Sequence, residues 1–193
     1  MLYQFDGKQP QVEAGTYVSE LAHVIGDVVI GKQCYIGHGA IIRGDYGRIV
    51  IGDGTAVEEG VIIHAPPGDT HTIGHKVTLG HGAILHGRSI GDLAVIGMGS
   101  VVSIFSQVGE RSIVAEGSVV KLNQVIPEKV VAAGNPAKVV KHLDSKEKFT
   151  TRASWFAEPE KLFKESNLWE KAVLEKNTFW HWLRYLFFPQ KGD

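Results

Sequence analysis

The sequence predicts an all-β solenoid, a parallel β-helix of hexapeptide repeats, with a C-terminal α-helix packed on it. Two observations predict the solenoid: aliphatic residues recur every six positions, and glycine often follows them, as in "VIGDVV" and "IGMGSV". Glycine accounts for 23 of the 193 residues. Position five of each hexad is usually Ala, Val, Ser or Thr, and such small residues suit tight corners. A third observation, the loss of this pattern near residue 140, predicts the helical extension.

The hexad period marks the inward-facing residues of the solenoid. Each six-residue unit forms one short side, its aliphatic residue points into a continuous core, and three sides make a coil of roughly 18 residues. The aliphatic positions are Val12, Val18, Val24, Ile30, Ile36, Ile42, Ile51, Val57, Ile63, Ile73, Leu79, Leu85, Ile90, Ile96, Val102, Val108, Val114, Val120, Ile126 and Ala132.

The chain divides into a β-helix domain, residues 1–140, and a helical extension, residues 141–193. In the extension, apolar residues recur at intervals of three to four, which predicts a helix along one side of the prism. These residues are Leu162, Phe163, Leu168, Trp169, Val173 and Leu174. The aromatic end "FWHWLRYLFF" is expected to pack on the β-helix or a neighbouring subunit, and a membrane-surface or partner-binding role is the less favoured alternative.

Composition limits the classes of function. The net charge of −1 and the absence of a Lys/Arg-rich run argue against nucleic-acid binding. The start "MLYQFDGKQP" has no leader pattern, and no segment approaches the length of a membrane-spanning helix, so we expect a cytoplasmic protein. The single cysteine, Cys34, is expected to be a small buried apolar residue without a chemical role.

Three irregularities interrupt the hexad count. Three residues are inserted between Ile42 and Ile51, four are inserted between Ile63 and Ile73, and one is missing between Leu85 and Ile90. Insertions in a solenoid map to loops on one face, which often carries the binding site. All three irregularities lie beside histidines or the segment "RGDYG".

Residues 18 apart, after insertions are removed, lie above one another in neighbouring coils. By this count Arg43, His64 and His86 form one column, because 21 less three and 22 less four both equal 18. His38, Glu59 and His81 form a second column in the same way. His64 and His86 can therefore share a metal ion, whereas His81 lies around a corner and needs a neighbouring subunit to reach them.

The other histidines carry weaker signals, because an isolated histidine is usually on the surface or satisfied by hydrogen bonds. We interpret four of them in this way: His23, His71, His142 and His181. The sequence assigns no role to His38 and His75.

The repeat, "RGDYG" and "VIIH…LGHGAILHG" together resemble the gamma-class carbonic anhydrases and the related PaaY and CaiE proteins. The resemblance implies a left-handed coil and a homotrimer whose subunit interfaces hold a metal ion on His64, His81 and His86. Three imidazoles with an open fourth position suit a hydrating zinc site, and Fe²⁺ and Co²⁺ are alternative ions. The implied reaction is the hydration of CO₂ to bicarbonate by a water that the metal ion acidifies.

Four further residues enter the candidate site through the resemblance. Arg43 and Asp45 correspond to an Arg and an Asp that pair across the family's subunit interface, and a structural salt bridge is compatible with orienting the site. Glu58 and Glu59 stand where the family commonly has Gln and Asp. Glu58 is thus either a general base or hydrogen-bond acceptor near the metal, or a solvated surface residue.

Two departures from the family pattern leave other activities open. The loop after His64, "APPGDTHT", is short and lacks the acidic proton shuttle, and Tyr46 replaces a further acidic residue. Efficient proton export is therefore in doubt. The alternatives are hydrolysis of an acyl thioester as in PaaY-like relatives, acyl transfer from coenzyme A with a histidine base, and a non-catalytic trimeric subunit.

Overall fold

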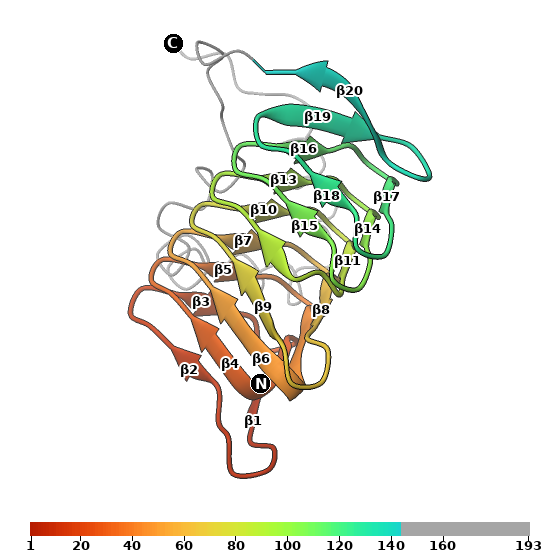
Figure 1. Cartoon of the computed structure of the whole chain (residues 1–193). Helices are drawn as coiled ribbons and strands as arrows, with labels where there is room; N and C mark the ends of the chain where they lie inside the picture. Colours follow the sequence, from red (N-terminus) through yellow and green to blue (C-terminus); the bar gives the residue numbers. More distant parts are fainter. Residues whose placement is uncertain (144–193) are drawn as a thin grey trace, which may run out of the picture. The chain divides into compact units, whose positions relative to one another are not determined.

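The computed structural model describes residues 1–143, which form a left-handed parallel β-helix with twenty short strands (Figure 1). This architecture confirms the predicted solenoid. One sheet forms the first side of the prism and contains β3 (Tyr17–Val18), β5 (Tyr35–Ile36), β7 (Ala56–Val57), β10 (Thr78–Leu79), β13 (Val95–Ile96), β16 (Ile113–Val114), β19 (Val130–Ala133) and β20 (Lys138–His142).

The second sheet covers the other two sides of the prism. Its strands are β1 (Leu2–Tyr3), β2 (Gln11–Val12), β4 (His23–Ile30), β6 (Ile41–Ile51), β8 (Ile62–His64), β9 (Thr70–Ile73), β11 (Ile84–Leu85), β12 (Ser89–Ile90), β14 (Val101–Val102), β15 (Gln107–Val108), β17 (Val119–Val120) and β18 (Val125–Ile126). The two sides belong to one sheet because β4 and β6 continue around the corner between them.

Strand β6 shows how this corner is built. Its first residues, 41–43, pair with β8 on the second side, and its last residues, 48–51, pair with β9 on the third side. The segment between them projects outward. The insertion after β8 and the shortened link after β11 lie at the same edge, so we define residues 43–48, 64–69 and 86–88 as the inserted corner.

The core is the column of aliphatic side chains inside the prism. Every predicted aliphatic position from Val24 to Ala132 is buried, and Val12 and Val18 are partly buried against them. Buried aliphatic surface stabilises the fold by about 25 cal/mol per Å². Because each coil buries its aliphatic side chains against the coils above and below it, each coil is stabilised mainly by its neighbours. Cys34 is also fully buried, as expected.

The described chain ends at an antiparallel pair. Strand β20 turns back on β19, with a register shift between Val131 and Ala132, and departs from the parallel order of the coils. The predicted C-terminal helix, the aromatic end and nearly all of the 141–193 extension lie outside the described residues. Within residues 1–143, no helix has the length and apolar character needed to cross a membrane.

Candidate metal centre

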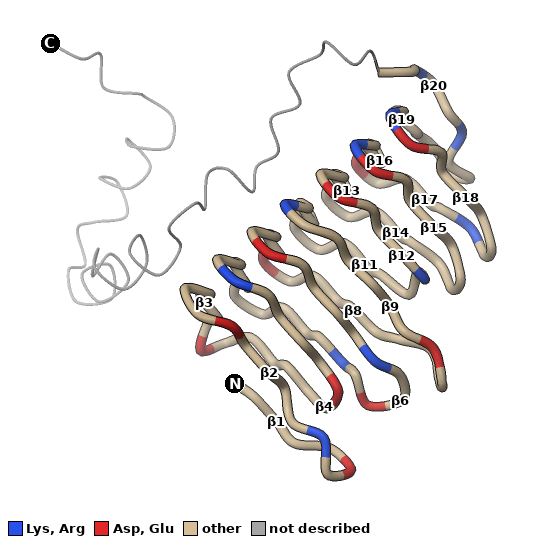
Figure 2. The backbone as a smooth tube through the Cα atoms, turned by 60° about the vertical axis from the view of Figure 1, so that its left-hand side comes forward, with Lys and Arg blue, Asp and Glu red and all other residues tan. Residues whose placement is uncertain are grey.

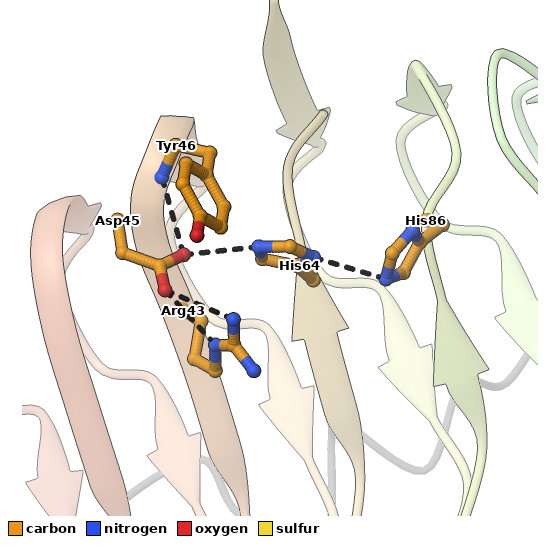
Figure 3. A network of polar contacts seen from close by, with 5 residues as sticks. All are labelled: Arg43, Asp45, Tyr46, His64 and His86. Carbon is orange, nitrogen blue, oxygen red and sulfur yellow. Dashed lines mark hydrogen bonds and ion pairs between the residues drawn. The ribbon is translucent and has the colours of Figure 1, made fainter. Parts of the chain in front are cut away.

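Two histidines meet at the inserted corner because their strands are in register. Arg43 of β6 pairs with His64 of β8, and Ile63 of β8 pairs with Leu85 of β11, which brings His86 beside His64. The predicted column of Arg43, His64 and His86 is therefore present. Figure 3 shows the two imidazoles facing each other across neighbouring coils.

The distance between these imidazoles suits a shared metal ion. Nδ1 of His64 lies 3.1 Å from Nε2 of His86, and the ring centroids are 4.7 Å apart. Two nitrogens bound to one tetrahedral zinc ion at about 2.0–2.1 Å would be roughly 3.3 Å apart. Burial lowers the pKa of His86, and the nearby His64 and Arg43 lower it further, which favours the neutral form that a metal ion requires.

Asp45 fixes the opposite nitrogen of His64. Its Oδ1 atom lies 2.9 Å from Nε2 of His64, and its Oδ2 atom accepts hydrogen bonds from Nη2 and Nε of Arg43 at 2.9 and 3.2 Å. Burial raises the pKa of Asp45, but hydrogen bonds from Arg43, its own backbone and His64 outweigh this effect and lower it. An ionised Asp45 that accepts the Nε2 proton leaves the Nδ1 lone pair of His64 directed at His86.

Glycines allow the segment that carries Asp45 to fit at the corner. A Cβ atom on Gly44 would lie 2.4 Å from the carbonyl oxygen of Asp27, and one on Gly47 would lie 2.2 Å from that of Pro66. Only a residue without a side chain permits such a close backbone approach. The sequence "RGDYG" therefore has a local structural reason as well as a chemical one.

Tyr46 lies beside His64 at the inserted corner. Its side chain is well exposed, and its ring stands edge-on to that of His64 with centroids 5.9 Å apart. The backbone N–H of Tyr46 donates to Oδ1 of Asp45 at 3.1 Å. An aromatic group with a free phenol end thus borders the site where the sequence resemblance implied an acidic residue.

His81 lies at the next corner of the prism, after β10. The Nδ1 atom of His81 is 2.7 Å from Oε2 of Glu59, and its Nε2 atom is 3.2 Å from Oε2 of Glu58. Glu58 also accepts the backbone N–H of His81 at 3.1 Å. Only 2% of Glu58 is exposed, so the alternative of a solvated surface glutamate is wrong.

Tyr35 completes this second cluster and was missed by sequence reasoning. Its hydroxyl donates a hydrogen bond of 2.5 Å to Oε1 of Glu59. The contact joins residues 24 apart, so no local motif reveals it. The sequence offered one signal for this contact: Tyr35 stands directly before the core residue Ile36, about one coil before the two glutamates.

The two clusters hold their histidines apart. His64 and His86 are together at the inserted corner, whereas His81 is grouped with Glu58 and Glu59. Within residues 1–143, no set of three His, Cys, Asp or Glu side chains is close enough to bind a metal ion. The described residues therefore place a pair of histidines at one corner and His81 at another, as the coil count predicted.

The interpretation of His71 as a surface or satisfied residue is wrong. His71 of β9 is fully buried, and neither ring nitrogen has a hydrogen-bond partner. It lies behind the histidine pair, since a Cβ atom on Gly87 would be 3.6 Å from its Nε2. Burial lowers the pKa of His71 to about 4, with a further decrease from His86 and a partial offset from the backbone of His64.

The remaining histidines have ordinary surroundings. His23 and His142 are exposed, as expected, and His181 lies outside the described residues. Nδ1 of His38 contacts the hydroxyl of Ser19, and Nδ1 of His75 accepts the backbone N–H of Asp53 at 3.0 Å.

Known proteins share this architecture and much of this sequence. The family model described as the hexapeptide repeat of succinyl-transferase matches residues 27–65 and 71–103. A protein named carbonic anhydrase from Geobacillus kaustophilus is 40% identical over 143 residues, which cover 74% of this chain and 79% of the relative. The carnitine operon protein CaiE of Escherichia coli K12 is 39% identical over 145 residues, covering 75% and 74%.

A solved structure agrees with the fold. The crystal structure of a hexapeptide transferase family protein from Anaplasma phagocytophilum has a TM-score of 0.78 and 30% sequence identity. The match covers 84% of this chain and 97% of that protein. Similar chains thus carry names from more than one class of enzyme.

Proposed function

The chain belongs to the hexapeptide-repeat family of left-handed β-helix proteins. On that premise we propose that it is a metalloenzyme of the gamma-class carbonic anhydrase type, which hydrates CO₂ to bicarbonate. One observation carries the proposal: Nδ1 of His64 and Nε2 of His86 face each other at 3.1 Å while Asp45 occupies the other nitrogen of His64. Two oriented imidazoles at this separation are two of the three ligands of a hydrating zinc site.

The third ligand in this proposal is His81 of a second chain. Within one chain His81 is at another corner of the prism, so a symmetric assembly has to bring it to the His64 and His86 pair. A homotrimer with its axis parallel to the β-helix does so at three equivalent interfaces. Zn²⁺ is the proposed ion, with Fe²⁺ and Co²⁺ as alternatives, and the proposed location is the cytoplasm.

The metal ion, when bound, supplies a Lewis acid that makes a water molecule nucleophilic near neutral pH. The protein's own groups set the geometry. Arg43 and Asp45 position His64, and the buried carboxylate of Glu58, which lies beside His81, is the proposed acceptor for a proton or hydrogen bond. Glu59 holds the other nitrogen of His81.

Tyr46 favours a second candidate, hydrolysis of an acyl thioester. Its exposed ring borders His64 with centroids 5.9 Å apart, at a position where a carboxylate would help to export a proton. A phenol is a poorer proton shuttle than a carboxylate. An aromatic wall does suit an acyl chain, and the same metal chemistry acts on a thioester carbonyl.

Subunit mixing tests the shared site directly. His64→Ala and His81→Ala variants should each bind little metal alone, because each destroys every site in its own trimer. After the two are unfolded and refolded together, a His81→Ala chain can offer His64 and His86 to the intact His81 of a His64→Ala chain. Random assembly then restores about a quarter of the sites.

The control mixes His64→Ala with a double variant that lacks both His64 and His81, which leaves no complete site. Recovery of metal content and activity in the first mixture alone supports the proposal. Equal metal content in the His81→Ala protein and the wild type would contradict the shared site.

The substrate is decided by paired assays of the same preparations. We expect stopped-flow CO₂ hydration in the wild type and its loss in His81→Ala. Thioester cleavage without CO₂ hydration would favour the second candidate. Acetyl transfer that depends on coenzyme A and resists chelators would favour a transferase, and an inactive trimer would indicate a non-catalytic subunit.

A further inference from the structure

We infer that Tyr35 is a positioning residue that, through Glu59, orients His81 so that Nε2 is the nitrogen offered to the metal ion shared with a second chain. This inference rests on the proposed function. It assigns a task to a buried phenol that belongs to neither "RGDYG" nor the histidine motif. Three consecutive contacts connect Tyr35 to His81.

The first contact fixes the phenol. Tyr35 belongs to β5, is only 2% exposed, and stacks on Tyr17 with ring centroids 5.6 Å apart and an angle of 10° between the planes. Its ring is therefore held in place by burial and by stacking on Tyr17. Burial raises the pKa of Tyr35, and Glu59 raises it further, so the hydroxyl keeps its proton and acts as a donor.

The second contact fixes Glu59. Tyr35 donates to Oε1 at 2.5 Å, and His81 lies 2.7 Å from Oε2, so each carboxylate oxygen has its own partner. The side chain of Glu59 is 38% exposed, and a glutamate with this freedom has several rotamers available. The hydrogen bond from a rigid phenol selects the rotamer that reaches His81.

The third contact selects the tautomer of His81. Both ring nitrogens face a carboxylate, but Glu59 is nearer to Nδ1, at 2.7 Å, than Glu58 is to Nε2, at 3.2 Å. The Glu58 oxygen also accepts the backbone N–H of His81, so in the neutral ring Nδ1 carries the proton and the lone pair is on Nε2. Asp45 accepts the proton of His64 at Nε2 instead, so the two histidines offer opposite nitrogens. Carboxylate partners of this kind fix ring orientation and tautomer at metal sites.

Glu58 occupies the position next to Nε2 of His81 that a metal ion would take. Its Oε2 atom is 3.2 Å from Nε2 of His81 and also accepts the backbone N–H of His81. If Nε2 held a metal ion, the backbone hydrogen bond from His81 would still keep Glu58 beside it. Tyr35 and Glu59 therefore determine the donor nitrogen, and Glu58 is the carboxylate beside it.

The test uses the full chain with Tyr35→Phe, which removes only the hydroxyl. Nitrogen-15 NMR of the metal-free protein reports the tautomer of His81, and competition with a chelator reports metal affinity. We expect the variant to lose the uniform Nδ1–H form and to bind zinc about 10-fold more weakly, at the lower end of effects of removed supporting groups. Tyr3→Phe is the matched control, since Tyr3 is an exposed tyrosine at the N-terminus.

Glu59→Gln provides a second variant at a partly exposed position, in case Tyr35→Phe folds poorly. A glutamine has one acceptor oxygen for two donors, so it cannot satisfy Tyr35 and His81 together. We expect its tautomer shift to be at least as large. An unchanged His81 tautomer in both variants would overturn the inference.

The two readouts separate this inference from the proposed function. If the wild type binds no metal ion, the proposed function fails, while the NMR signal still decides whether Tyr35 orients His81. If the wild type binds zinc and Tyr35→Phe binds it equally well with an unchanged tautomer, the role of Tyr35 fails alone.

Discussion

Nε2 of His64 lies 2.9 Å from Oδ1 of Asp45, on the side of the ring opposite to His86. The carboxylate thus occupies the nitrogen that points away from the neighbouring coil. The other carboxylate oxygen is held by Arg43, so Asp45 cannot turn aside without losing an ion pair. This contact therefore fixes the ring of His64 in the orientation that the proposed metal site requires.

Replacing Asp45 by Asn should weaken metal binding. The Asn side chain has one acceptor oxygen, so either Arg43 or His64 faces an NH₂ group and loses its hydrogen bond. We expect affinity to fall about 10- to 100-fold, as when other supporting partners of metal ligands are removed. Titration of the metal-free protein with zinc in the presence of a competing chelator measures the change.

The control is Asp27→Asn. Asp27 pairs with Lys8 at 3.2 Å and with Arg48 at 3.8 Å, and both of these cations are largely exposed. Exposed ion pairs contribute little, so metal affinity should stay within about twofold. Equal losses in the two variants would show that Asp45 acts only through general stability or charge.

Gly47→Ala should deform the inserted corner. The new Cβ atom would lie 2.2 Å from the carbonyl oxygen of Pro66 and 2.6 Å from that of Asp69, and neither backbone group can rotate away. We expect a loss of about 1–3 kcal/mol in the free energy of unfolding, typical of overpacking, together with weaker metal binding. Chemical denaturation and metal titration measure the two effects.

Gly68→Asn is the control for this change. Gly68 lies in the same loop with φ of +71°, and nothing is within 4 Å of a Cβ atom there. Asparagine tolerates this backbone conformation better than other residues with side chains. If Gly47→Ala has the same free energy of unfolding as the wild type, the close approach of Gly47 to the backbone of Pro66 and Asp69 is contradicted.

Cys34 should resist thiol reagents in the folded protein. It is fully buried, and burial raises the pKa of its thiol to about 11, so the reactive thiolate is scarce. A disulfide reagent applied near pH 8, where exposed thiols with a pKa of about 8.5 react readily, should label the native chain far more slowly than the unfolded chain. Lys32→Cys adds an exposed thiol as a positive control, and rapid labelling of native Cys34 would contradict its burial.

Much of the fold and the placement of the histidines could be predicted by counting. A coil has a nearly constant number of residues, so the position of an aliphatic residue fixes its side of the prism and its height. The count placed Arg43 beside His64 because insertions add loop length without changing which strands pair. It also showed that His81 belongs to another corner.

Counting could not predict how side chains meet. The contact of Tyr35 with Glu59 depends on rotamers of two long side chains on different coils, which the hexad period does not determine. The depth of Glu58 depends equally on how the neighbouring coil closes over it.

His71 was misread for a different reason. It follows directly after the inserted residues 64–69, which interrupt the hexad count. Strand β9 is longer than most, however, and alternation along a strand puts His71 on the same side as Ile73, inside the prism. The period of two, applied from Ile73 backwards, would have found it.

His71→Leu should therefore stabilise the protein, and more so in acid. Leucine removes two buried nitrogens without partners, each of which costs about 1–3 kcal/mol. The pKa of His71 is about 4 in the folded chain, below its ordinary value of 6.5, so the wild type keeps its full stability above that value and loses it as the pH falls toward 4. Urea unfolding at several pH values should show a difference in the free energy of unfolding between His71→Leu and the wild type that widens by up to about 3 kcal/mol.

His142→Leu, at an exposed position, should not produce this widening. A constant difference between His71→Leu and the wild type would show that His71 gains a proton without unfolding the coil around it.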